Sequence, residues 1–288
     1  MFRIYDTRTG RLEEVGPVPG RLLRLYARAP AQRPAHAGEL RTLLVADLIR
    51  RNAEHRHGLT VLASLVMPGA GNEGAASAND AVTGADAGAL NVRPADQTAR
   101  NPERAGSPGG AVGPGEIIIE VQPGPEDGHA TVWHSVRVGP VTFAARSDDA
   151  RSDDARSDDS ASSAELSALA DRGLDPLALR LALMSCHHAE PANLTWGVLT
   201  DADLALRRWR ELVAEWAESP SRPMCAEVTS QVAAAFDGDL DTPTALRALR
   251  ALENDPQIPP GSKFESFLHA DQLLALDLPR EIGRQRRG

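Results

Sequence analysis

The chain has 288 residues, of which 42% are hydrophobic and 4% aromatic, and its formal net charge is −9. This excess of negative charge argues against a nucleic-acid binder that relies mainly on electrostatic attraction. No apolar run is long enough to predict a membrane-spanning helix, and the first residues lack the apolar segment of a signal peptide. The two cysteines, Cys186 and Cys225, cannot build a disulfide framework. We therefore expect a cytoplasmic protein without a membrane partner.

The cationic residues are unusual in kind, because Lys263 is the only lysine and every other cation is an arginine. Their distribution is also uneven, since the net charge is positive over residues 1–65 and negative over the rest of the chain. Any chemistry that requires a lysine in the first 262 residues is therefore excluded. The change in charge also indicates that the chain consists of unlike parts.

Residues 1–67 follow the pattern of a βαβ unit. Apolar residues at spacings of three and four predict a helix that Gly58 ends. A strand, a helix and a strand within so few residues predict a parallel sheet and an α/β layer. The expected elements are strands at residues 2–5, 22–26 and 60–66, a turn at Thr9-Gly10 and a helix over residues 39–57.

Residues 68–115 consist mostly of Gly, Ala, Asn, Asp and Pro, with almost no large apolar side chain. Such a segment cannot bury enough surface to offset the entropy lost on ordering, so we predict a disordered insert. In residues 116–144 the alternation returns. Residues 117–121 and 131–138 predict strands joined by a Pro-Gly-Pro-Glu-Asp-Gly turn, and residues 141–143 are a third candidate strand. We expect these strands to complete the sheet.

Three uninterrupted copies of Ala-Arg-Ser-Asp-Asp begin at Ala145 and end at Asp159. A period of five residues matches neither a helix nor a strand. A slipped duplication of DNA is the simpler explanation, and a selected acidic tract is the alternative. Either origin predicts a solvated, acidic loop over residues 145–162.

Residues 163–288 carry helical patterns throughout. Asp175-Pro176 and Asp241-Thr-Pro243 combine an N-cap residue with a proline in the first helical turn. Trp209, Leu212, Val213 and Trp216 recur at helical spacing and predict a face buried in a core. We therefore predict a small α-helical bundle. The expected helices cover residues 163–172, 176–187, 194–217, 224–236, 243–253 and 263–276.

Short motifs at both ends of the chain carry a family resemblance. The first part contains Tyr5-Asp-Thr-Arg-Thr-Gly10, Arg24-Leu-Tyr26 and Ala35-His-Ala-Gly-Glu-Leu-Arg-Thr42. The last part contains Gly173-Leu-Asp-Pro-Leu-Ala-Leu-Arg, Asn193-Leu-Thr-Trp196 and Asp239-Leu-Asp-Thr-Pro-Thr-Ala-Leu246. These motifs resemble the opening strands, the Ala-His-Ile-Gly-His-Ala-Arg-Thr signature and the helical bundle of cysteinyl-tRNA synthetase. They fit equally well its sister family, the cysteine ligases of mycothiol biosynthesis. The resemblance implies a reduced Rossmann-like layer followed by the bundle.

The resemblance assigns nucleotide binding to His36, Gly38 and Glu39. In the family, two histidines lie at a helix N-terminus, where the helix dipole and the free N–H groups favour phosphate. This chain keeps His36 and Gly38, but Glu39 stands at the second histidine position and would repel a triphosphate. A loop histidine without a role is the alternative interpretation of His36.

The family's Lys-Met-Ser-Lys-Ser signature has no counterpart in this chain. Its two lysines stabilise negative charge on the phosphates, and their positions correspond to about Ser147 and Ala150, inside the acidic repeat. Arg146 and Arg151 are nearby cations, but the aspartates of the repeat oppose their charge. Transition-state stabilisation by lysine is therefore not predicted.

The resemblance also implies a zinc ion that protein thiolates and a histidine hold in place. This ion binds the thiolate of the substrate. The first thiolate position corresponds to residues 27–29, which hold Ala, Arg and Ala. Cys186-His187-His188 is the other candidate, but adjacent side chains on one helix should point in different directions. We therefore predict no metal site and expect no zinc.

The joint loss of these features favours a catalytically degenerate relative of cysteinyl-tRNA synthetase. We expect a binding or interaction protein with an unknown protein partner and no cofactor. The alternative is an active class I cysteine ligase that forms cysteinyl-adenylate from ATP, with tRNA or an amino sugar as the acceptor. The chain also ends without the anticodon-recognition domain expected of a full synthetase. A pseudogene product without a stable role is the third interpretation.

Overall fold

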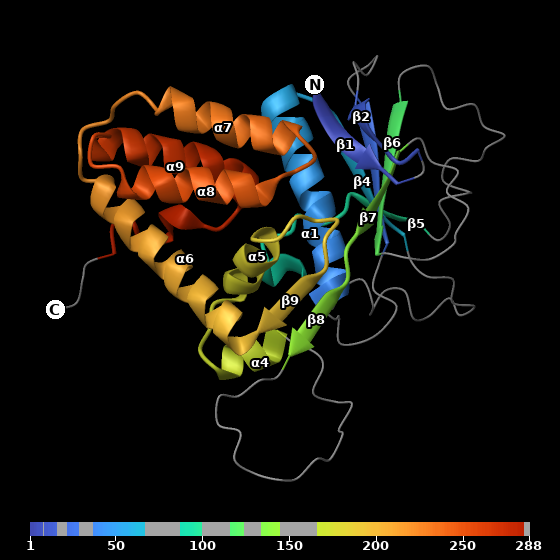
Figure 1. The fold of residues 1–288 in the computed structure, drawn as a ribbon, viewed down its shortest axis with the longest axis horizontal. Helices are drawn as coiled ribbons and strands as arrows, with labels where there is room; N and C mark the ends of the chain where they lie inside the picture. The colour runs from blue at the N-terminus through green and yellow to red at the C-terminus, as the bar shows by residue number, and fades with distance from the viewer. Residues whose placement is uncertain are drawn as a thin grey trace, which may run out of the picture.

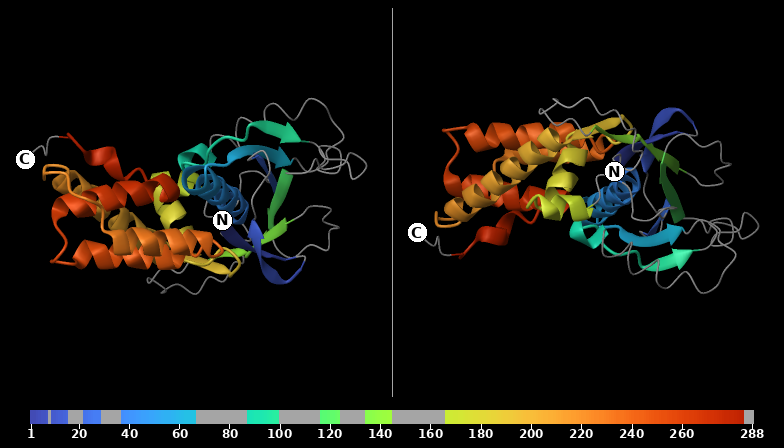
Figure 2. Two further views of the ribbon diagram at one scale, coloured as in Figure 1. Left: turned by 90° about the horizontal axis from the view of Figure 1, so that it is seen from above. Right: turned by 90° about the horizontal axis from the view of Figure 1, so that it is seen from below.

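A parallel sheet and a group of helices lie on opposite sides of the central helix α1 (Ala37–Arg51) (Figure 1). The same arrangement is visible from above and from below (Figure 2). This computed structural model describes residues 1–7, 9–15, 22–28, 37–66, 87–99, 116–123, 134–144 and 166–284. The N-terminal parallel sheet and the mainly helical C-terminal part agree with the predicted order of the two regions.

The chain begins with an antiparallel hairpin of β1 (Phe2–Asp6) and β2 (Arg11–Val15). Phe2 and Ile4 are buried, whereas their neighbours Arg3 and Tyr5 are exposed. One face of β1 therefore packs on the core. Gly10 has a φ of +68°, a conformation that glycine adopts without a steric penalty. The predicted strand and turn are confirmed, and β2 is an element that the sequence analysis did not find.

The main sheet has five parallel strands in the order β5-β4-β3-β6-β7. From β3 the chain moves outward to β4 and β5, and it then returns to place β6 on the other side of β3. The strand order therefore reverses between β3 and β6. The strands are β3 (Leu22–Arg28), β4 (Thr60–Val66), β5 (Gln97–Ala99), β6 (Glu116–Pro123) and β7 (His134–Val138).

One expectation about the strands of residues 116–144 was wrong. β6 and β7 join the main sheet, as expected, and pair in parallel with each other. β8 (Val141–Ala144) does not extend the sheet but pairs in parallel with β9 (Ala192–Thr195). The bend before β8 requires Gly139, because a Cβ atom there would lie 2.2 Å from the carbonyl oxygen of Glu190. This close approach turns the chain out of the sheet.

The predicted insert 68–115 contains a structured segment, residues 87–99. A helical turn at residues 87–89 leads to Leu90, whose side chain is fully buried, and the segment ends in β5 beside β4. The low apolar content hid this element, because a single leucine supplies its central contact with the core. The rest of the predicted insert lies outside the described residues, as does the predicted loop 145–162.

Helix α1 is buried along most of its length, since 12 of its 15 residues are buried. A helix that is covered on all sides requires layers on both of its faces, and here the sheet and the helical bundle provide them. The helix continues through a π-helical turn, η2 (Asn52–Arg56), and stops before Gly58, which has a φ of +60°. The predicted helix over residues 39–57 and its glycine stop are confirmed.

The predicted helices of the C-terminal part are confirmed, except at residue 194 and at residues 185–187, which lie beyond the end of α5 although the predicted helix 176–187 included them. Asp175, Thr195 and Asp241 cap the N-termini of α5, α6 and α8 through their side-chain oxygens. Leu194 belongs to β9 rather than to a helix, so the predicted span 194–217 began too early. The elements are α4 (Leu166–Asp171), α5 (Pro176–Met184), α6 (Trp196–Trp216), α7 (Ala226–Asp237), α8 (Thr242–Asn254), α9 (Pro260–Leu274) and η4 (Leu278–Glu281).

The predicted apolar stripe of α6 forms the centre of this part. Trp209, Val213 and Trp216 are buried, and both tryptophan rings meet the ring of Phe267 from α9 nearly edge-on at 5.6 and 5.1 Å. Such contacts add to the burial of aromatic surface. Within the described part of the chain, no helix is both long and apolar enough to cross a bilayer.

Candidate functional site

A ligand is first expected where the carboxyl ends of the parallel strands lie beside α1, which is called the sheet edge below. In open parallel sheets, ligands bind outside the carboxyl ends of the strands where the strand order reverses. Here that point lies between β3 and β6, and α1 begins nine residues after β3 ends. Gly38 and Glu39 lie in the first turn of α1, whereas His36 lies outside the described residues.

The first turn of α1 carries a carboxylate at this edge. An acidic residue in the first turn stabilises a helix, because it compensates the positive end of the dipole. Glu39 therefore favours the helix but opposes a phosphate that would approach the same N–H groups. Glu39 is half-buried. Of the predicted nucleotide-binding residues, the structure describes Gly38 and Glu39. They provide backbone N–H groups but no cationic side chain.

The residues present do not fit the catalytic groups of the family. Ala27, at the end of β3, is buried and has no atom that can bind zinc. The only lysine, Lys263, lies on α9, where its Nζ donates to the carbonyl oxygen of Glu253 at 2.9 Å. Cys186 and Cys225 follow α5 and precede α7, and neither belongs to the sheet. The described groups therefore supply no lysine or thiolate at the sheet edge.

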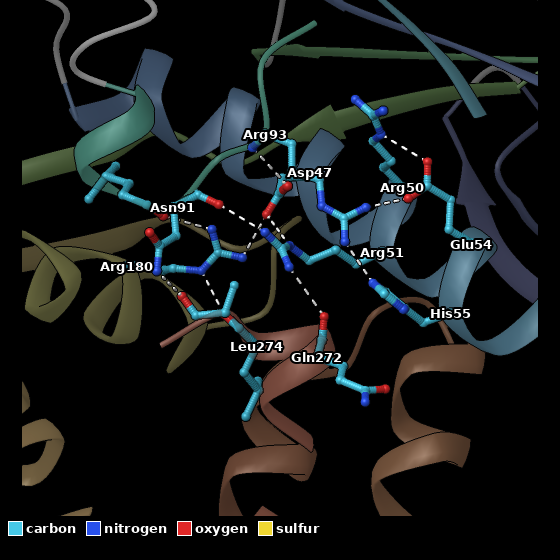
Figure 3. A network of polar contacts seen from close by, with 12 residues as sticks. Asp47, Arg50, Arg51, Glu54, His55, Asn91, Arg93, Arg180, Gln272 and Leu274 are labelled. Carbon is cyan, nitrogen blue, oxygen red and sulfur yellow. Dashed lines mark hydrogen bonds and ion pairs between the residues drawn. The ribbon is translucent and has the colours of Figure 1, made fainter. Parts of the chain in front are cut away.

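The opposite half of α1 contains a buried polar network (Figure 3). One carboxylate oxygen of Asp47 accepts hydrogen bonds from Arg51 Nε and Arg180 Nη2, both at 2.8 Å. The other oxygen accepts from the backbone N–H of Arg93 at 3.1 Å. The side chains of Asp47 and Arg180 are completely buried. This group, with its carbonyl partners, is called the Asp47 network below.

The Asp47 network also satisfies its arginines. Arg180 donates to the carbonyl oxygens of Leu274 at 2.6 Å and Leu90 at 2.8 Å. Arg51 donates to the carbonyl oxygens of Gln272 and Asn91. The network therefore connects α1, the segment 87–99, α5 and α9. It fixes the sheet layer against the helices.

Electrostatics keep Asp47 ionised inside the protein. Burial opposes the charge of this carboxylate, but the charges and hydrogen bonds of Arg180 and Arg51 outweigh the effect of burial and lower its pKa. Both oxygens of Asp47 have donors within the protein, and the side chain is completely buried. We therefore assign this network a structural role.

A second set of ion pairs holds the segment 87–99 on α1. Arg50 donates to Glu54 at 3.0 Å and to Asp96 at 3.2 Å, and Arg93 pairs with the other oxygen of Glu54. Arg93 also lies 2.6 Å from a ring nitrogen of His55 (Figure 3). The charges of both arginines are therefore compensated by neighbouring carboxylates.

A cavity of about 310 Å³ lies between α1, the strands β3 and β4 and the segment 87–99. Aliphatic side chains form most of its lining among the described residues. Asp47, Ser64 and the two arginines Arg50 and Arg93 also line it, and carboxylates already compensate the charges of both arginines. The cavity therefore suits a mainly apolar group. The aliphatic side chains are those of Leu25, Ala27, Leu43, Ala46, Ala63, Leu65, Ala87, Val92, Pro94 and Ala95.

The structure places Cys186, His187 and His188 in a loop after α5 and not on one helix. The two histidine rings lie 4.4 Å apart, and both approach the carboxylate of Asp239 from the loop before α8. The expectation that the two histidines point in different directions was therefore wrong. Burial, with the charges of His187 and Arg41, lowers the pKa of His188 to about 3, so its ring is neutral at pH 7.

Sequence reasoning missed the Asp47 network and the approach of Asp239 to the two histidines. A carboxylate on the buried side of the 39–57 helix, four residues before Arg51, was a usable signal for the first. Its main partner, Arg180, is 133 positions away and has no local signature. Asp239 is likewise about 50 residues from the histidines, so only the fold reveals that contact.

Similar curated proteins align with part of the chain. Over 84 residues it is 39% identical to the L-cysteine:1D-myo-inositol 2-amino-2-deoxy-alpha-D-glucopyranoside ligase of Segniliparus rotundus. It is 36% identical over 117 residues to the ligase of the same name from Mycolicibacterium smegmatis, and 31% identical over 111 residues to that from Renibacterium salmoninarum. The chain is a partial homologue of these cysteine ligases. No family model matches it.

These ligases are a sister family of cysteinyl-tRNA synthetase, so the predicted resemblance is confirmed at the level of that relationship. The matches cover 29%, 39% and 38% of this chain but only 19%, 27% and 25% of the three ligases. The similarity is thus limited to about a fifth to a quarter of each ligase. It supports a ligase-like ancestry.

Proposed function

We propose that the chain is a catalytically degenerate relative of the cysteine ligases that acts as a cytoplasmic binding or interaction protein. The position of Lys263 carries this proposal. A class I ligase needs cations that stabilise the phosphates of ATP in the transition state. The single lysine of this chain donates to a backbone carbonyl and lies 5.6 Å from the ring centroid of Trp216, within the helical part. It is therefore engaged away from the sheet edge.

Two further observations support the same conclusion. Glu39 places a negative charge in the first turn of α1, and Ala27 stands where the resemblance implies the first zinc ligand. At the same time the strand order supports a reduced Rossmann-like layer, and the Asp47 network keeps that layer docked on the helices. A scaffold with a mainly apolar cavity and, among the described residues, no lysine at the sheet edge is suited to binding. Its partner is proposed to be another protein.

The relatives favour an active enzyme as the second candidate. All three are named as ligases that join L-cysteine to an amino sugar. In that case ATP would be the cosubstrate, with an amino sugar or tRNA as the acceptor. Arginines of the segments 68–115 and 145–162 would then have to supply the missing cations. The first segment lies partly, and the second wholly, outside the described residues.

Cysteine-dependent exchange of pyrophosphate into ATP distinguishes the two candidates, because it requires formation of cysteinyl-adenylate. We expect the purified full chain to show no exchange above a reaction without cysteine. The M. smegmatis ligase serves as the active control. Exchange that persists in a His36→Ala variant of this chain would come from a contaminating host enzyme. Robust exchange that His36→Ala abolishes would overturn the proposal and favour the active ligase.

A further inference from the structure

Two loops bring three metal-binding side chains together on the helical side of the molecule. His187 and His188 come from the loop after α5, and Asp239 comes from the loop between α7 and α8. One ligand atom from each residue lies within 4.8 Å of the other two. The loop of the two histidines lies beside the end of β7, since the backbone N–H of Gly139 donates to the carbonyl oxygen of His188 at 2.8 Å. None of the three residues stands at positions 27–29, where the family resemblance implies the first zinc ligand.

The distances within the cluster are characteristic of metal ligands. Nε2 of His187 lies 3.5 Å from Oδ2 of Asp239, and Nε2 of His188 lies 3.8 Å from Oδ1. Both distances exceed those of ordinary hydrogen bonds, about 2.7–3.2 Å. Donors bound to one tetrahedral zinc ion at about 2.1 Å lie about 3.4 Å from one another. The two Nε2–carboxylate distances are therefore close to the spacing of ligands around a shared ion, and all three ligand atoms lie within 4.8 Å of one another.

His188 supplies a second, independent observation. Its side chain is only 5% exposed, and its Nδ1 is buried without a hydrogen-bond partner among the described residues. Its Nε2 has no acceptor closer than the 3.8 Å contact with Asp239 in the same part of the chain. Buried polar atoms almost always have partners, so a ring without hydrogen bonds inside the protein requires an explanation. An ion at Nε2 would give the ring one polar partner, whereas Nδ1, the nitrogen that is buried without a partner among the described residues, would stay unpaired.

Hydrogen bonds from α1 and β1 hold the two loops in position. Arg41 of α1 donates to the carbonyl oxygens of His187, Glu190 and Gly139 at 2.7, 2.6 and 3.0 Å. The backbone N–H of Tyr5 donates to Oδ1 of Asp239 at 2.7 Å. Such outer contacts orient ligands and contribute strongly to metal affinity. The cluster is therefore rigid before any ion binds.

The environment permits a cation to enter. The side chain of His187 is 25% exposed and that of Asp239 is 16% exposed, so the cluster opens to solvent on this side. Asp241 adds negative charge next to Asp239, while Arg41 adds positive charge next to His188. Binding at Nε2 of His187 would replace its 3.1 Å hydrogen bond to the carbonyl oxygen of Asp239. That exchange is local and leaves the loop contacts of Arg41 intact.

We propose that His187, His188 and Asp239 bind a divalent transition-metal ion of the zinc type. Two imidazoles and one carboxylate are a ligand set that proteins use for zinc, and three protein ligands leave the fourth position open to water. Cys186 is not part of the set, because its sulfur contacts the carbonyl oxygens of His187 and Pro191 instead. The site does not depend on the proposed function and requires neither ATP nor cysteine.

The test is calorimetric titration of Zn²⁺ alone into the full chain, without a histidine tag and after removal of metals with EDTA. We expect one Zn²⁺ per chain. Asp239→Asn and His187→Ala should each weaken binding at least about tenfold, as loss of a ligand exceeds the effect of an outer contact. Co²⁺ should give the visible absorption bands of a four-coordinate ion, and Zn²⁺ should displace it.

The variants are chosen to fold. Asp239 has a φ of +65°, a conformation in which asparagine is favoured, and the amide oxygen can still accept from Tyr5. Asp241→Asn is the matched control, because asparagine caps a helix as well as aspartate does, and it should leave the affinity nearly unchanged. Cys186→Ser should also bind normally. Absence of stoichiometric binding, or binding that survives Asp239→Asn but is lost in Cys186→Ser, would overturn the proposal.

Discussion

The two ends of helix α1 differ in what they do for the molecule. Its first turn, at the carboxyl edge of the sheet, presents Glu39 and no cationic side chain among the described residues. Its last turns carry Asp47 and Arg51, which join four segments through buried hydrogen bonds. Among the described residues, one helix therefore carries an acidic first turn at one end and a complete structural network at the other.

The difference has a physical cause. A buried ion pair that loses one partner leaves a charge without compensation, which typically costs about 3–5 kcal/mol. An acidic residue in an accessible first turn contributes only about 0.3–1 kcal/mol to stability. Substitutions in the first turn of α1 can therefore accumulate without unfolding the protein, whereas substitutions in the Asp47 network cannot. The proposed loss of chemistry is thus compatible with retention of the scaffold within one helix.

The largest expected effect comes from removing the carboxylate of Asp47. Asp47→Ala should lower the free energy of unfolding by about 3–5 kcal/mol, because Arg180 would remain buried without its partner. The matched substitution at the other end of the helix, Glu39→Ala, should cost no more than about 1 kcal/mol. Urea unfolding followed by circular dichroism measures both. Equal losses would show that the two ends of α1 do not differ as argued.

Arg41 tests where the structural part of α1 begins, since it lies only two positions after Glu39. Arg41→Lys should destabilise the protein by about 2 kcal/mol, because one ammonium cannot replace a planar fork that reaches three carbonyl oxygens. Arg208→Lys is the control, since that side chain is 62% exposed and pairs only with Glu253 among the contacts described. The melting temperatures of the two variants provide the comparison. A loss at Arg208 as large as that at Arg41 would contradict this account.

The pH dependence of stability should distinguish the Asp47 network from the first turn of α1. The folded protein lowers the pKa of Asp47 below its ordinary value of 3.8, so ionised Asp47 stabilises the fold above that value. This stabilisation should be lost as the pH falls from about 4 through the folded pKa, because the unfolded chain then binds more protons. Asp47→Asn should flatten the acid limb of the stability profile. Urea midpoints between pH 3 and pH 7 measure the slope, and an unchanged slope would exclude Asp47 as its source.

Local signals in the sequence were sufficient to predict most helices. The caps at Asp175 and Asp241 and the stripe through Trp209 depend on neighbours within one or two helical turns, so they can be recognised without the fold. The parallel sheet likewise followed from the spacing of the first strands and α1. The order of the two regions could therefore be predicted.

Strand partners and buried side-chain networks could not be predicted in the same way. β8 has the composition of a strand, but its partner β9 is about 50 residues away and contains only four residues. Asp47 and Arg180 are separated by 133 positions, and neither position alone indicates a partner. Such contacts depend on how elements pack, which a single sequence does not encode locally. The same reason explains why Asp239 was not connected with His187 and His188.

The smallest expected effect concerns restoration of the family's signature. We predict that Glu39→His combined with Ser147→Lys and Ala150→Lys will not restore binding of ATP, although the three changes supply the groups that the resemblance implies. A single donor in such a site contributes on the order of 3–4 kcal/mol to the transition state. That contribution requires placement within about 0.5 Å by surrounding side chains.

The surroundings in this chain oppose that placement. The two lysines would stand among the six aspartates of the acidic repeat, and the sheet edge supplies no other cation among the described residues of α1's first turn. Calorimetric titration of ATP and Mg²⁺ into the triple variant decides the question, with Glu39→His alone as the control. Micromolar binding by the triple variant would show that only local changes separate the chain from its ligase relatives. In that case the first turn of α1 would be as intact as the last turns with Asp47 and Arg51, and the comparison between them would fail.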